Sequence, residues 1–201
     1  RETVTTCKQP GPCGRRLRYH LKRTGHLHTM DIRSLIRKIP DYPSPGTTYY
    51  DLTTLMRDGA GFHALVDELA ARYAPRGIRK FACMEWRGFV LGAALAYRLR
   101  AGFVPIRRLG KLTGLTISRG HEFGPTSEPL EMSVDAIAPG ETVVLVDDML
   151  ATGAVSDAAA MLIKDVGGNL VECCFVHELA ALGGRKRLEK HGLTVFTLWD
   201  N

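Results

Sequence analysis

Residues 143–156 read V-V-L-V-D-D-M-L-A-T-G-A-V-S, and this string is the most informative part of the chain. The four apolar, mostly β-branched residues at its start are typical of a strand that is buried on both faces. Two carboxylates, Asp147 and Asp148, stand where the apolar run stops. Small residues follow, and then an alanine-rich helical stretch over about residues 156–164. The string therefore predicts a strand, an acidic edge, a tight loop and a helix in an α/β fold.

The predicted loop has the features of a phosphate-binding site. A loop that runs into a helix N-terminus presents free backbone N–H groups and the positive end of the helix dipole. Ligands of open α/β sheets lie beyond the carboxyl ends of the strands, where Asp147 and Asp148 stand. Two acids beside a phosphate suit sugar hydroxyls, a divalent cation or both. A lone Asp-Asp pair would merely end a core strand, so the argument depends on the whole string.

The composition fits one globular α/β domain with its own core. The chain has 201 residues, of which 45% are hydrophobic and 24% charged. No apolar run approaches the ~20 residues of a membrane span. The five cysteines lack C-x-x-C spacing, which favours free thiols in a reducing compartment over a zinc site or a disulfide framework.

The positive net charge comes from one segment. Residues 1–29 hold seven of the 27 lysines and arginines and one of the 21 acids, so this segment alone accounts for the net charge of +6. We interpret residues 1–29 as a basic extension, artefactual or disordered, and residues 30–201 as the single domain. A basic interaction arm is the alternative. Because the body is neutral, the charge does not support a nucleic-acid role for it.

Apolar spacing predicts the other elements. A short amphipathic helix is expected over residues 32–39, ended by Pro40, and a core-packing helix over residues 62–73. Further strands are expected at residues 78–84, 102–106, 170–175 and 193–198, and a further helix at residues 90–100.

The Asp-Asp string resembles the phosphoribosyl-pyrophosphate loop of type I phosphoribosyltransferases, in which a hydrophobic strand leads into D-D-x-x-A-T-G-G-T. Here the string runs from Asp147 to Val155 and departs at its end, where Ala154 and Val155 replace Gly and Thr. The added Cβ and the lost hydroxyl both fall at the expected phosphate site, although Ser156 could replace the hydroxyl.

Other segments are similar to adenine phosphoribosyltransferases in particular, and they come in that family's order over residues 31–199. Residues 39–53 resemble I-P-D-F-P-x-P-G-x-x-F-R-D-I-T, with Tyr50 in place of Arg, and residues 85–89 resemble E-A-R-G-F. Residues 104–116 resemble V-P-x-R-K-x-G-K-L-P-G-x-T, and residues 178–185 resemble E-L-x-x-L-x-G-R. The family's S-Y-x-L-E-Y-G loop has no clear counterpart after Ile117.

The resemblance implies a fold and a reaction. The fold would be a central, mostly parallel sheet flanked by helices, with a small N-terminal hood. The reaction would join a purine base, most simply adenine, to phosphoribosyl pyrophosphate or a close analogue, giving a nucleoside monophosphate and pyrophosphate. A cytoplasmic, Mg²⁺-dependent homodimer of purine salvage is expected, without membrane or nucleic-acid partners.

The resemblance also implies roles for individual residues. Asp147 and Asp148 would hold the sugar hydroxyls, stabilise the developing sugar cation, and bind Mg²⁺ directly or only through water or substrate. Glu122 would handle the base proton, with His121 as second choice. The phosphate site would comprise Ala151, Thr152, Gly153, Ala154, Val155 and Ser156; the pyrophosphate site Arg87, Arg107, Arg108 and Lys111; and the base site Thr48, Tyr49, Tyr50, Glu85 and Trp86.

The departures from the family pattern leave two alternatives open. Ala154, Val155, Tyr50 and the rewritten loop suggest a diverged member with a non-ribose phosphosugar donor or a modified base, as in nucleoside natural-product biosynthesis. A less favoured alternative is a regulator that senses phosphoribosyl pyrophosphate and binds nucleic acid through its basic segment.

Overall fold

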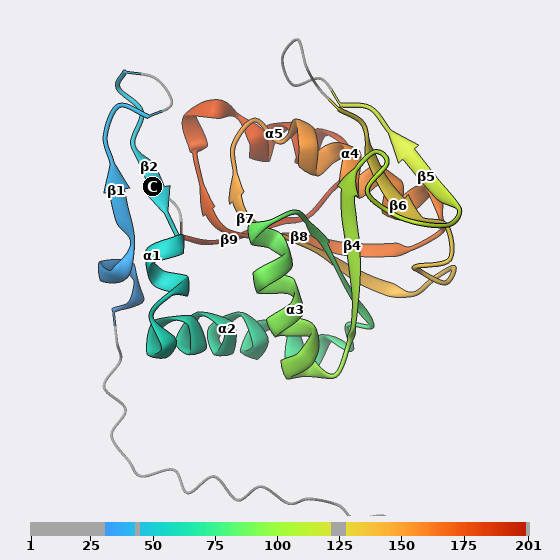
Figure 1. Cartoon of the computed structure of the whole chain (residues 1–201), viewed down its shortest axis with the longest axis horizontal. Coiled ribbons are helices and arrows are strands. Elements are labelled where there is room, and N and C mark those ends of the chain that lie inside the picture. The colour runs from blue at the N-terminus through green and yellow to red at the C-terminus, as the bar shows by residue number, and fades with distance from the viewer. Residues whose placement is uncertain (1–30, 43–44, 122–127, 200–201) are drawn as a thin grey trace, which may run out of the picture.

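A seven-stranded sheet forms the centre of the fold. The computed structural model describes residues 31–42, 45–121 and 128–199, so the basic segment 1–29 lies outside the described residues. The strands lie in the order β5-β6-β4-β3-β7-β8-β9 (Figure 1). β4, β3, β7, β8 and β9 are parallel neighbours, and β6 runs antiparallel to β4 and β5, so the expected mostly parallel sheet is confirmed. The strand bounds are β3 Lys80–Met84, β4 Gly102–Arg108, β5 Thr116–Arg119, β6 Leu130–Ser133, β7 Thr142–Leu150, β8 Asn169–Glu178 and β9 Val195–Trp199.

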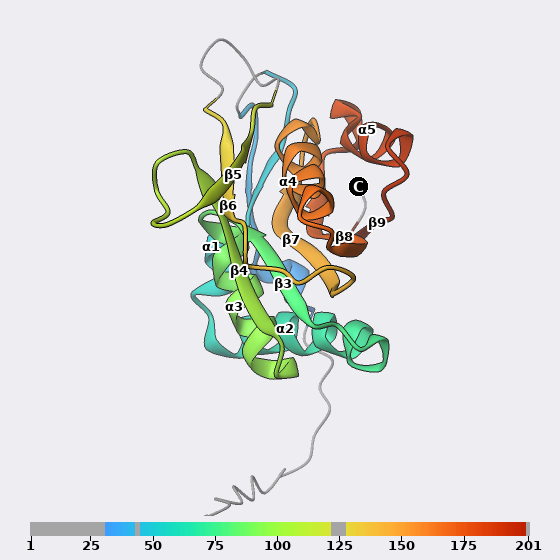
Figure 2. The same ribbon diagram turned by 90° about the vertical axis from the view of Figure 1, so that its right-hand side faces the viewer.

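Helices cover both faces of this sheet, as expected (Figure 2). One face packs against α2 and α3 and the other against α4 and α5. The side chains of β7 alternate accordingly, because Val144 and Val146 join the first apolar cluster while Val143 and Leu145 join the second. The helix bounds are α1 Thr53–Met56, α2 Gly59–Tyr73, α3 Arg87–Leu99, α4 Ala154–Asp165 and α5 Gly184–Lys190, with 3-10 turns at Ile32–Leu35, Ala74–Arg76 and Ala180–Leu182.

The central strand is longer than its apolar run predicts. β7 continues through Asp147 and Asp148 to Leu150, because its last residues still pair with β8. Met149 lies opposite His177, and Leu150 lies opposite Glu178. The two aspartates are therefore held by a sheet strand rather than by a loop.

Two short strands near the N-terminal end of the described residues form a hood. The prediction of a helix over residues 32–39 is wrong. Only Ile32–Leu35 makes a helical turn, after which β1 (Arg37–Ile39) pairs antiparallel with β2 (Tyr49–Asp51). Ile39 precedes Pro40, which disfavours helical backbone at that residue. Strand pairing with a distant segment therefore overrides the helical spacing of the apolar residues.

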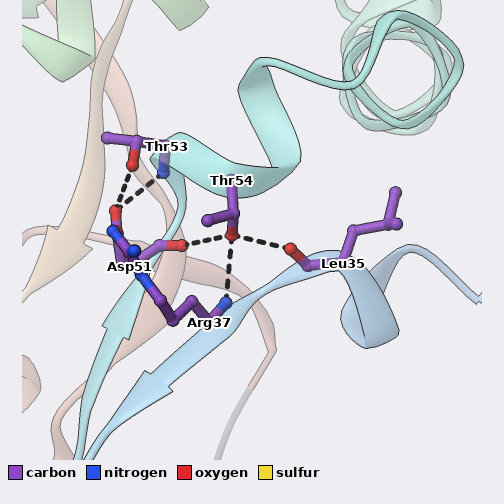
Figure 3. Close-up of polar contacts among 5 residues, drawn as sticks. All are labelled: Leu35, Arg37, Asp51, Thr53 and Thr54. Carbon is purple, nitrogen blue, oxygen red and sulfur yellow. Dashed lines mark hydrogen bonds and ion pairs between the residues drawn. The ribbon is translucent and has the colours of Figure 1, made fainter.

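Polar contacts fasten the hood to α1 (Figure 3). The Asp51 carboxylate accepts hydrogen bonds from the backbone N–H and the hydroxyl of Thr53, at 3.0 and 2.6 Å, and from Arg37 Nε at 3.1 Å. The Thr54 hydroxyl accepts from the Arg37 N–H at 3.0 Å and donates to the Leu35 carbonyl at 2.7 Å. These contacts fix the course of β2, which carries two of the candidate base-site residues.

A buried carboxylate ties α2 to the sheet. Glu172 on β8 is 2% exposed and accepts hydrogen bonds from Arg72 Nε and Nη2, both at 2.8 Å, and from the Tyr73 hydroxyl at 2.7 Å. Arg76 Nη1 lies 3.0 Å from the same carboxylate. Burial favours the neutral acid, but these donors outweigh it and lower the pKa of Glu172.

Replacement of Glu172 by glutamine is expected to lower the free energy of unfolding at pH 7 by about 1–2 kcal/mol, since both arginines are about a third exposed and partly solvated. Because the folded pKa lies below the ordinary glutamate value of about 4.3, this stabilisation is complete above that value and is lost as the pH falls through the folded pKa. Urea titrations should therefore show wild type to be more stable than E172Q at pH 7, with a difference that shrinks as the pH falls below about 4.3. Asp67→Asn, in an exposed pair with Arg98, is the control. Equal stability of E172Q and wild type at pH 7 would contradict this account.

Candidate active site

The candidate site residues meet at one edge of the parallel sheet. β3, β4 and β7 are parallel neighbours, so their carboxyl ends lie side by side. Glu85 follows β3, Arg107 and Arg108 end β4, and the two aspartates lie near the end of β7. This is the edge at which open α/β sheets bind ligands.

An ion pair joins two of the predicted residues. Arg87, the first residue of α3, donates from its Nε to the carboxylate of Asp148, which is 3% exposed. The guanidinium also lies 5.6 Å from the centre of the Trp86 ring. Burial would lower the pKa of Arg87, but the carboxylate of Asp148 outweighs it and raises that pKa. The structure thus places a permanent positive and a negative charge together beside the sugar site that the sequence predicts.

Asp147 is held differently from its neighbour. Its Oδ1 accepts the Asp148 backbone N–H at 2.9 Å. A Cβ at Gly88 would lie 3.0 Å from this oxygen and 2.8 Å from the Val146 carbonyl, so α3 can begin this close only with glycine there. Burial first, and then the nearby Asp148 charge, raise the pKa of Asp147 well above its ordinary value. The two adjacent acids therefore lie in different environments, since Asp148 pairs with Arg87 whereas Asp147 accepts a backbone N–H.

The loop after β4 is organised by two acids. Glu85 accepts from Arg107 Nε at 2.8 Å, and Arg107 Nη1 donates to the Lys111 carbonyl at 3.0 Å. Glu131, 2% exposed, accepts the backbone N–H groups of Lys111 and Leu112, each at 2.7 Å. Sequence reasoning assigned Glu131 no role. Its carboxylate shapes the loop that carries the predicted pyrophosphate cations.

The other predicted cations lie on the outside of this region. Arg108 is exposed and approaches Glu128, with 3.5 Å between Nη1 and Oε2, and Lys111 is exposed too. Burial would raise the pKa of Glu85, but the hydrogen bonds from Arg107 and the Arg108 N–H, together with the charges of both arginines, outweigh it and lower that pKa. Arg107 is thus paired with protein, whereas the exposed ammonium of Lys111 is placed to meet an anion from solvent.

The loop between β7 and α4 has the form that the sequence predicts for a phosphate cradle. Gly153 is the N-cap residue of α4, with φ of +74°, and has no side chain to cap the helix, so N–H groups of the first turn can serve a ligand. The Thr152 hydroxyl accepts a long hydrogen bond from the Ala154 N–H, at 3.5 Å. Ala151 and Thr152 are half-buried at the bend before the helix.

The structure explains how the two departures in this loop are accommodated. Ala154 is the first residue of α4 and has no positive φ, so its Cβ creates no backbone strain. The Val155 side chain is partly buried and packs against the second apolar cluster. Ser156 is 4% exposed and lies within the helix. The substitutions are therefore compatible with an intact phosphate loop.

The candidate base-site residues come from the hood, at and just before β2, and from the turn after β3. Thr48 and Tyr50 line a pocket of about 520 Å³ together with residues 179–182. Tyr49 lies in the field of Arg87 and Asp148, and burial is the main cause of its raised pKa. The ring centre of Tyr50 lies 4.3 Å from that of His177 on β8. Glu85 and Trp86 follow β3, and Trp86 is 58% exposed.

Sequence reasoning missed the opposite wall of this pocket. Residues 179–182 come from the E-L-A-A-L-G-G-R segment, which resembles the family pattern but for which the sequence predicted no function. The sequence did contain a signal for a function here, because this segment resembles a family motif although it lies outside the predicted loops.

The structure describes only one of the two candidates for the base proton. Glu122 lies outside the described residues. His121 lines a second pocket of about 370 Å³ with Ala154, Asp157 and Lys190, beside α4 and α5. Its Nδ1 is buried without a hydrogen-bond partner among the described residues.

Residues 31–42, 45–121 and 128–199 contain no group of three or more His, Cys, Asp or Glu side chains that could hold a metal ion. Asp147 and Asp148 are only a pair, and one of them is engaged by arginine. Such a donor set fits Mg²⁺ bound largely by water and substrate oxygens, since this ion retains much of its hydration in proteins. In the same ranges, every helix is too short or too polar to serve as a transmembrane segment.

Comparisons with known proteins agree with this geometry. The phosphoribosyl transferase domain matches residues 57–201. Adenine phosphoribosyltransferase of Nitrosospira multiformis is 48% identical over 171 residues, which cover 85% of this chain and 98% of that protein. The enzyme of the same name from Neorhizobium galegae is also 48% identical, over 85% of this chain and 94% of that protein.

Solved structures give the same result. Adenine phosphoribosyltransferase of Thermoanaerobacter pseudethanolicus superposes with a TM-score of 0.78 at 39% identity, over 85% of this chain and 98% of that chain. The Saccharomyces cerevisiae enzyme, solved with adenine and an imino-altritol bisphosphate, gives 0.78 at 34% identity over 84% and 96%. The protein thus belongs to the adenine phosphoribosyltransferase family.

Proposed function

We propose that this protein transfers the phosphoribosyl group of phosphoribosyl pyrophosphate to adenine, giving AMP and pyrophosphate. The observation that carries the proposal is the Asp147-Asp148 pair, with Arg87 on Asp148, beside an uncapped helix N-terminus in a chain 48% identical to adenine phosphoribosyltransferases. An ordinary donor is favoured over a non-ribose sugar because Ala154 and Val155 leave the phosphate loop unstrained.

The chemistry makes limited demands on the protein. A ring nitrogen of the base attacks the anomeric carbon, the bond from that carbon to the pyrophosphate oxygen breaks, and its electron pair leaves with pyrophosphate. Positive charge develops on the sugar, as in glycoside cleavage. Asp147 and Asp148 stabilise this charge and hold the hydroxyls. Stabilising charge that appears only in the transition state is the most effective use of such groups.

The remaining residues hold the reactants in place. The N–H groups of residues 151–156 bind the sugar phosphate, and the cations Arg87, Arg107, Arg108 and Lys111 receive pyrophosphate. The opening of the Arg107–Glu85 pair would release that guanidinium for the anion. The base lies against Thr48, Tyr49 and Tyr50, near Glu85 and Trp86. Glu122 takes the proton that the base loses.

Magnesium fits this arrangement as a partner of the substrate. It would be held by pyrophosphate and sugar oxygens, with Asp147 and Asp148 reaching it directly or through water. When bound, the ion neutralises charge on the leaving pyrophosphate. The two aspartates keep their hydroxyl-binding role beside it.

We further infer a single domain over residues 30–201, with residues 1–29 as an extension, and a cytoplasmic location. The two apolar clusters share one sheet, which supports the single domain. Cys83, Cys173 and Cys174 are buried and free, as in proteins of reducing compartments. The match to the phosphoribosyl transferase domain, at residues 57–201, lies entirely outside the basic segment.

We also infer a homodimer, supported by apolar side chains on the outer face of α3 and the adjoining strand. Tyr97 is 89% exposed, Trp86 58%, Phe103 38% and Val90 37%. Trp86, Val90 and Tyr97 follow a spacing of four and seven residues, which puts them on one side of the helix. A second copy of the chain would cover an apolar surface that reaches the candidate site through Trp86.

Replacement of Tyr97 by aspartate is expected to shift the protein from dimer to monomer and raise the dimer dissociation constant at least about tenfold, because a charge would be buried at the interface. Sedimentation velocity across a dilution series measures the shift. Val134→Asp, at another exposed apolar residue, should leave the oligomeric state unchanged. A Y97D variant as dimeric as wild type would place the interface elsewhere.

A donor-by-base activity screen tests the proposed function. Purified protein with Mg²⁺ is given phosphoribosyl pyrophosphate and adenine, guanine, hypoxanthine or uracil, and both pyrophosphate release and the nucleotide mass are recorded. We expect AMP to form far faster than any other product, and chelation of Mg²⁺ to suppress it. Faster transfer from another phosphosugar or to another base would favour the diverged alternative, and no transfer would overturn the proposal.

A further inference from the structure

The segment 178–185 begins at the last residue of β8 and has no role in the reaction as described above. Its two ends are joined, because Arg185 donates from Nε and Nη2 to the Glu178 carboxylate at 2.9 and 2.7 Å. Arg185 also donates to the Thr197 hydroxyl at 2.7 Å and to the Val195 carbonyl at 3.2 Å, both on β9. Glu178 is 5% exposed. The start of α5 is therefore anchored to the last two strands of the sheet.

This anchored point touches the phosphate loop backbone to backbone. A Cβ at Gly184 would lie 2.2 Å from the Ala151 carbonyl oxygen and 3.0 Å from the Gly153 nitrogen. The reverse also holds, since a Cβ at Gly153 would lie 2.8 Å from the Gly184 carbonyl oxygen and 3.1 Å from its Cα. Because backbone atoms cannot move aside as a side-chain end does, no room for a methyl group exists on either side.

The requirement for glycine at position 184 is one of space rather than of backbone conformation. Gly184 is the first residue of α5 and has no positive φ. Its neighbour Gly183 is the opposite case, with φ of +72° and no described atom within 4 Å of the place where a Cβ would lie. Gly192 beyond the end of α5 resembles Gly183, with φ of +69° and open space. At Gly183 and Gly192, a side chain would strain the backbone but would meet no neighbouring atom. At Gly184, a side chain would not strain the backbone but would clash with the phosphate loop.

We propose that Gly184 is a positioning residue for the phosphosugar donor, acting through the backbone of Ala151 and Gly153. Its close approach sets the direction in which the N–H groups of the loop point. The Glu178–Arg185 ion pair fixes the position of Gly184 relative to the sheet. The proposal rests on the proposed function, because it assigns the donor phosphate to this loop. Residues 179–182 of the same segment line the pocket beside Thr48 and Tyr50.

Gly184→Ala tests the proposal by separating the two substrates. The added methyl group must displace the loop, and a displacement near 1 Å can cost about 100-fold in a reaction. We expect KM for phosphoribosyl pyrophosphate to rise at least about tenfold, with KM for adenine within about threefold of wild type. Leu150→Ala, which removes a flexible side chain close to this point, should not rescue G184A, because the Ala151 carbonyl remains in the way.

Gly183→Ala and Gly192→Ala are the matched controls. Each places alanine at a positive φ, a backbone conformation that strains an L side chain, and should lower the melting temperature by a few degrees. Neither methyl group meets the phosphate loop, so KM for the donor should stay within about twofold of wild type. If the role of Gly184 were purely structural, G184A, G183A and G192A would have similar KM values for phosphoribosyl pyrophosphate.

A binding measurement keeps the test independent of turnover. Calorimetric titration of ribose 5-phosphate into wild type and G184A should show at least about tenfold weaker binding to the variant. If wild type forms no AMP yet this difference appears, the proposed function fails while the positioning role stands. If G184A does not fold, Arg185→Lys, which loses the two-pronged hold on Glu178, should raise donor KM in the same selective way. Unchanged donor binding in a folded G184A, or an equal loss in G183A, would overturn the proposal.

Discussion

Asp148→Asn is expected to lower kcat/KM for AMP formation by about 100- to 1,000-fold, which corresponds to about 3–4 kcal/mol of transition-state stabilisation. The amide keeps the shape of the side chain but removes the negative charge beside the developing sugar cation. Because the residue is 3% exposed, water screens that charge poorly and its loss is felt in full. Steady-state kinetics with both substrates measure the change, which should fall mainly on kcat.

The stability of D148N should change much less than its activity. The Arg87 side chain is 26% exposed and can be hydrated once its partner is neutral. Asp165→Asn is the matched control, since it neutralises a carboxylate paired with Arg119 at 2.8 Å on the exposed side of α4 and should retain full activity. Activity of D148N within about threefold of wild type would show that the carboxylate does not stabilise the transition state.

The parts of the fold that the sequence predicted are those in which local pattern and tertiary structure agree. The apolar run at residues 143–146 predicted a strand buried on both faces because each of its side chains enters a core cluster. The helical stripe over residues 62–73 lies within α2 for the same reason. The Asp-Asp string indicated the site because strand, acids, loop and helix are consecutive in the chain.

The parts that could not be predicted depend on contacts between distant segments. The spacing of apolar residues 32–39 suited a helix, yet only Ile32–Leu35 makes a helical turn, and Arg37–Ile39 pairs with residues about twelve positions later. β7 runs past its apolar part because of β8, which lies beyond the following helix. Glu131 shapes the Lys111 loop from another strand, and Gly184 supports the phosphate loop from about 30 residues away. Sequence pattern identifies the groups that meet the substrate more readily than those that hold them.

The structure also changes how the pyrophosphate cations are understood. As a sequence motif, Arg87 and Arg107 are two free positive charges, but in the fold each is paired with an acid, Asp148 and Glu85. A cation that must serve a substrate in a partly buried site is best kept paired before the substrate arrives, because an unpaired buried charge is costly. In the free protein, Asp148 and Glu85 therefore also neutralise the charges of these two arginines. Variants of the Arg87–Asp148 pair should for this reason change stability and catalysis by different amounts.

Arg87→Ala is expected to lower the free energy of unfolding by about 2–3 kcal/mol, because it leaves the buried carboxylate of Asp148 without its cation. The cost is below that of breaking a fully buried pair, since a quarter of the arginine side chain is exposed. It should appear as a fall of about 4–10 °C in melting temperature. Arg98→Ala, on the same helix but in an exposed pair with Asp67, should cost less than about 1 kcal/mol.

The double variant R87A/D148N decides between a charge effect and a packing effect. If the loss in R87A comes from an uncompensated buried charge, neutralising Asp148 removes its cause, and the double variant should regain most of the stability. Activity should not return, because both the pyrophosphate cation and the carboxylate beside the sugar are then absent. If the double variant is instead as unstable as R87A, the arginine stabilises the fold through its contacts with Trp86 and the start of α3, and its charge is held for the substrate alone.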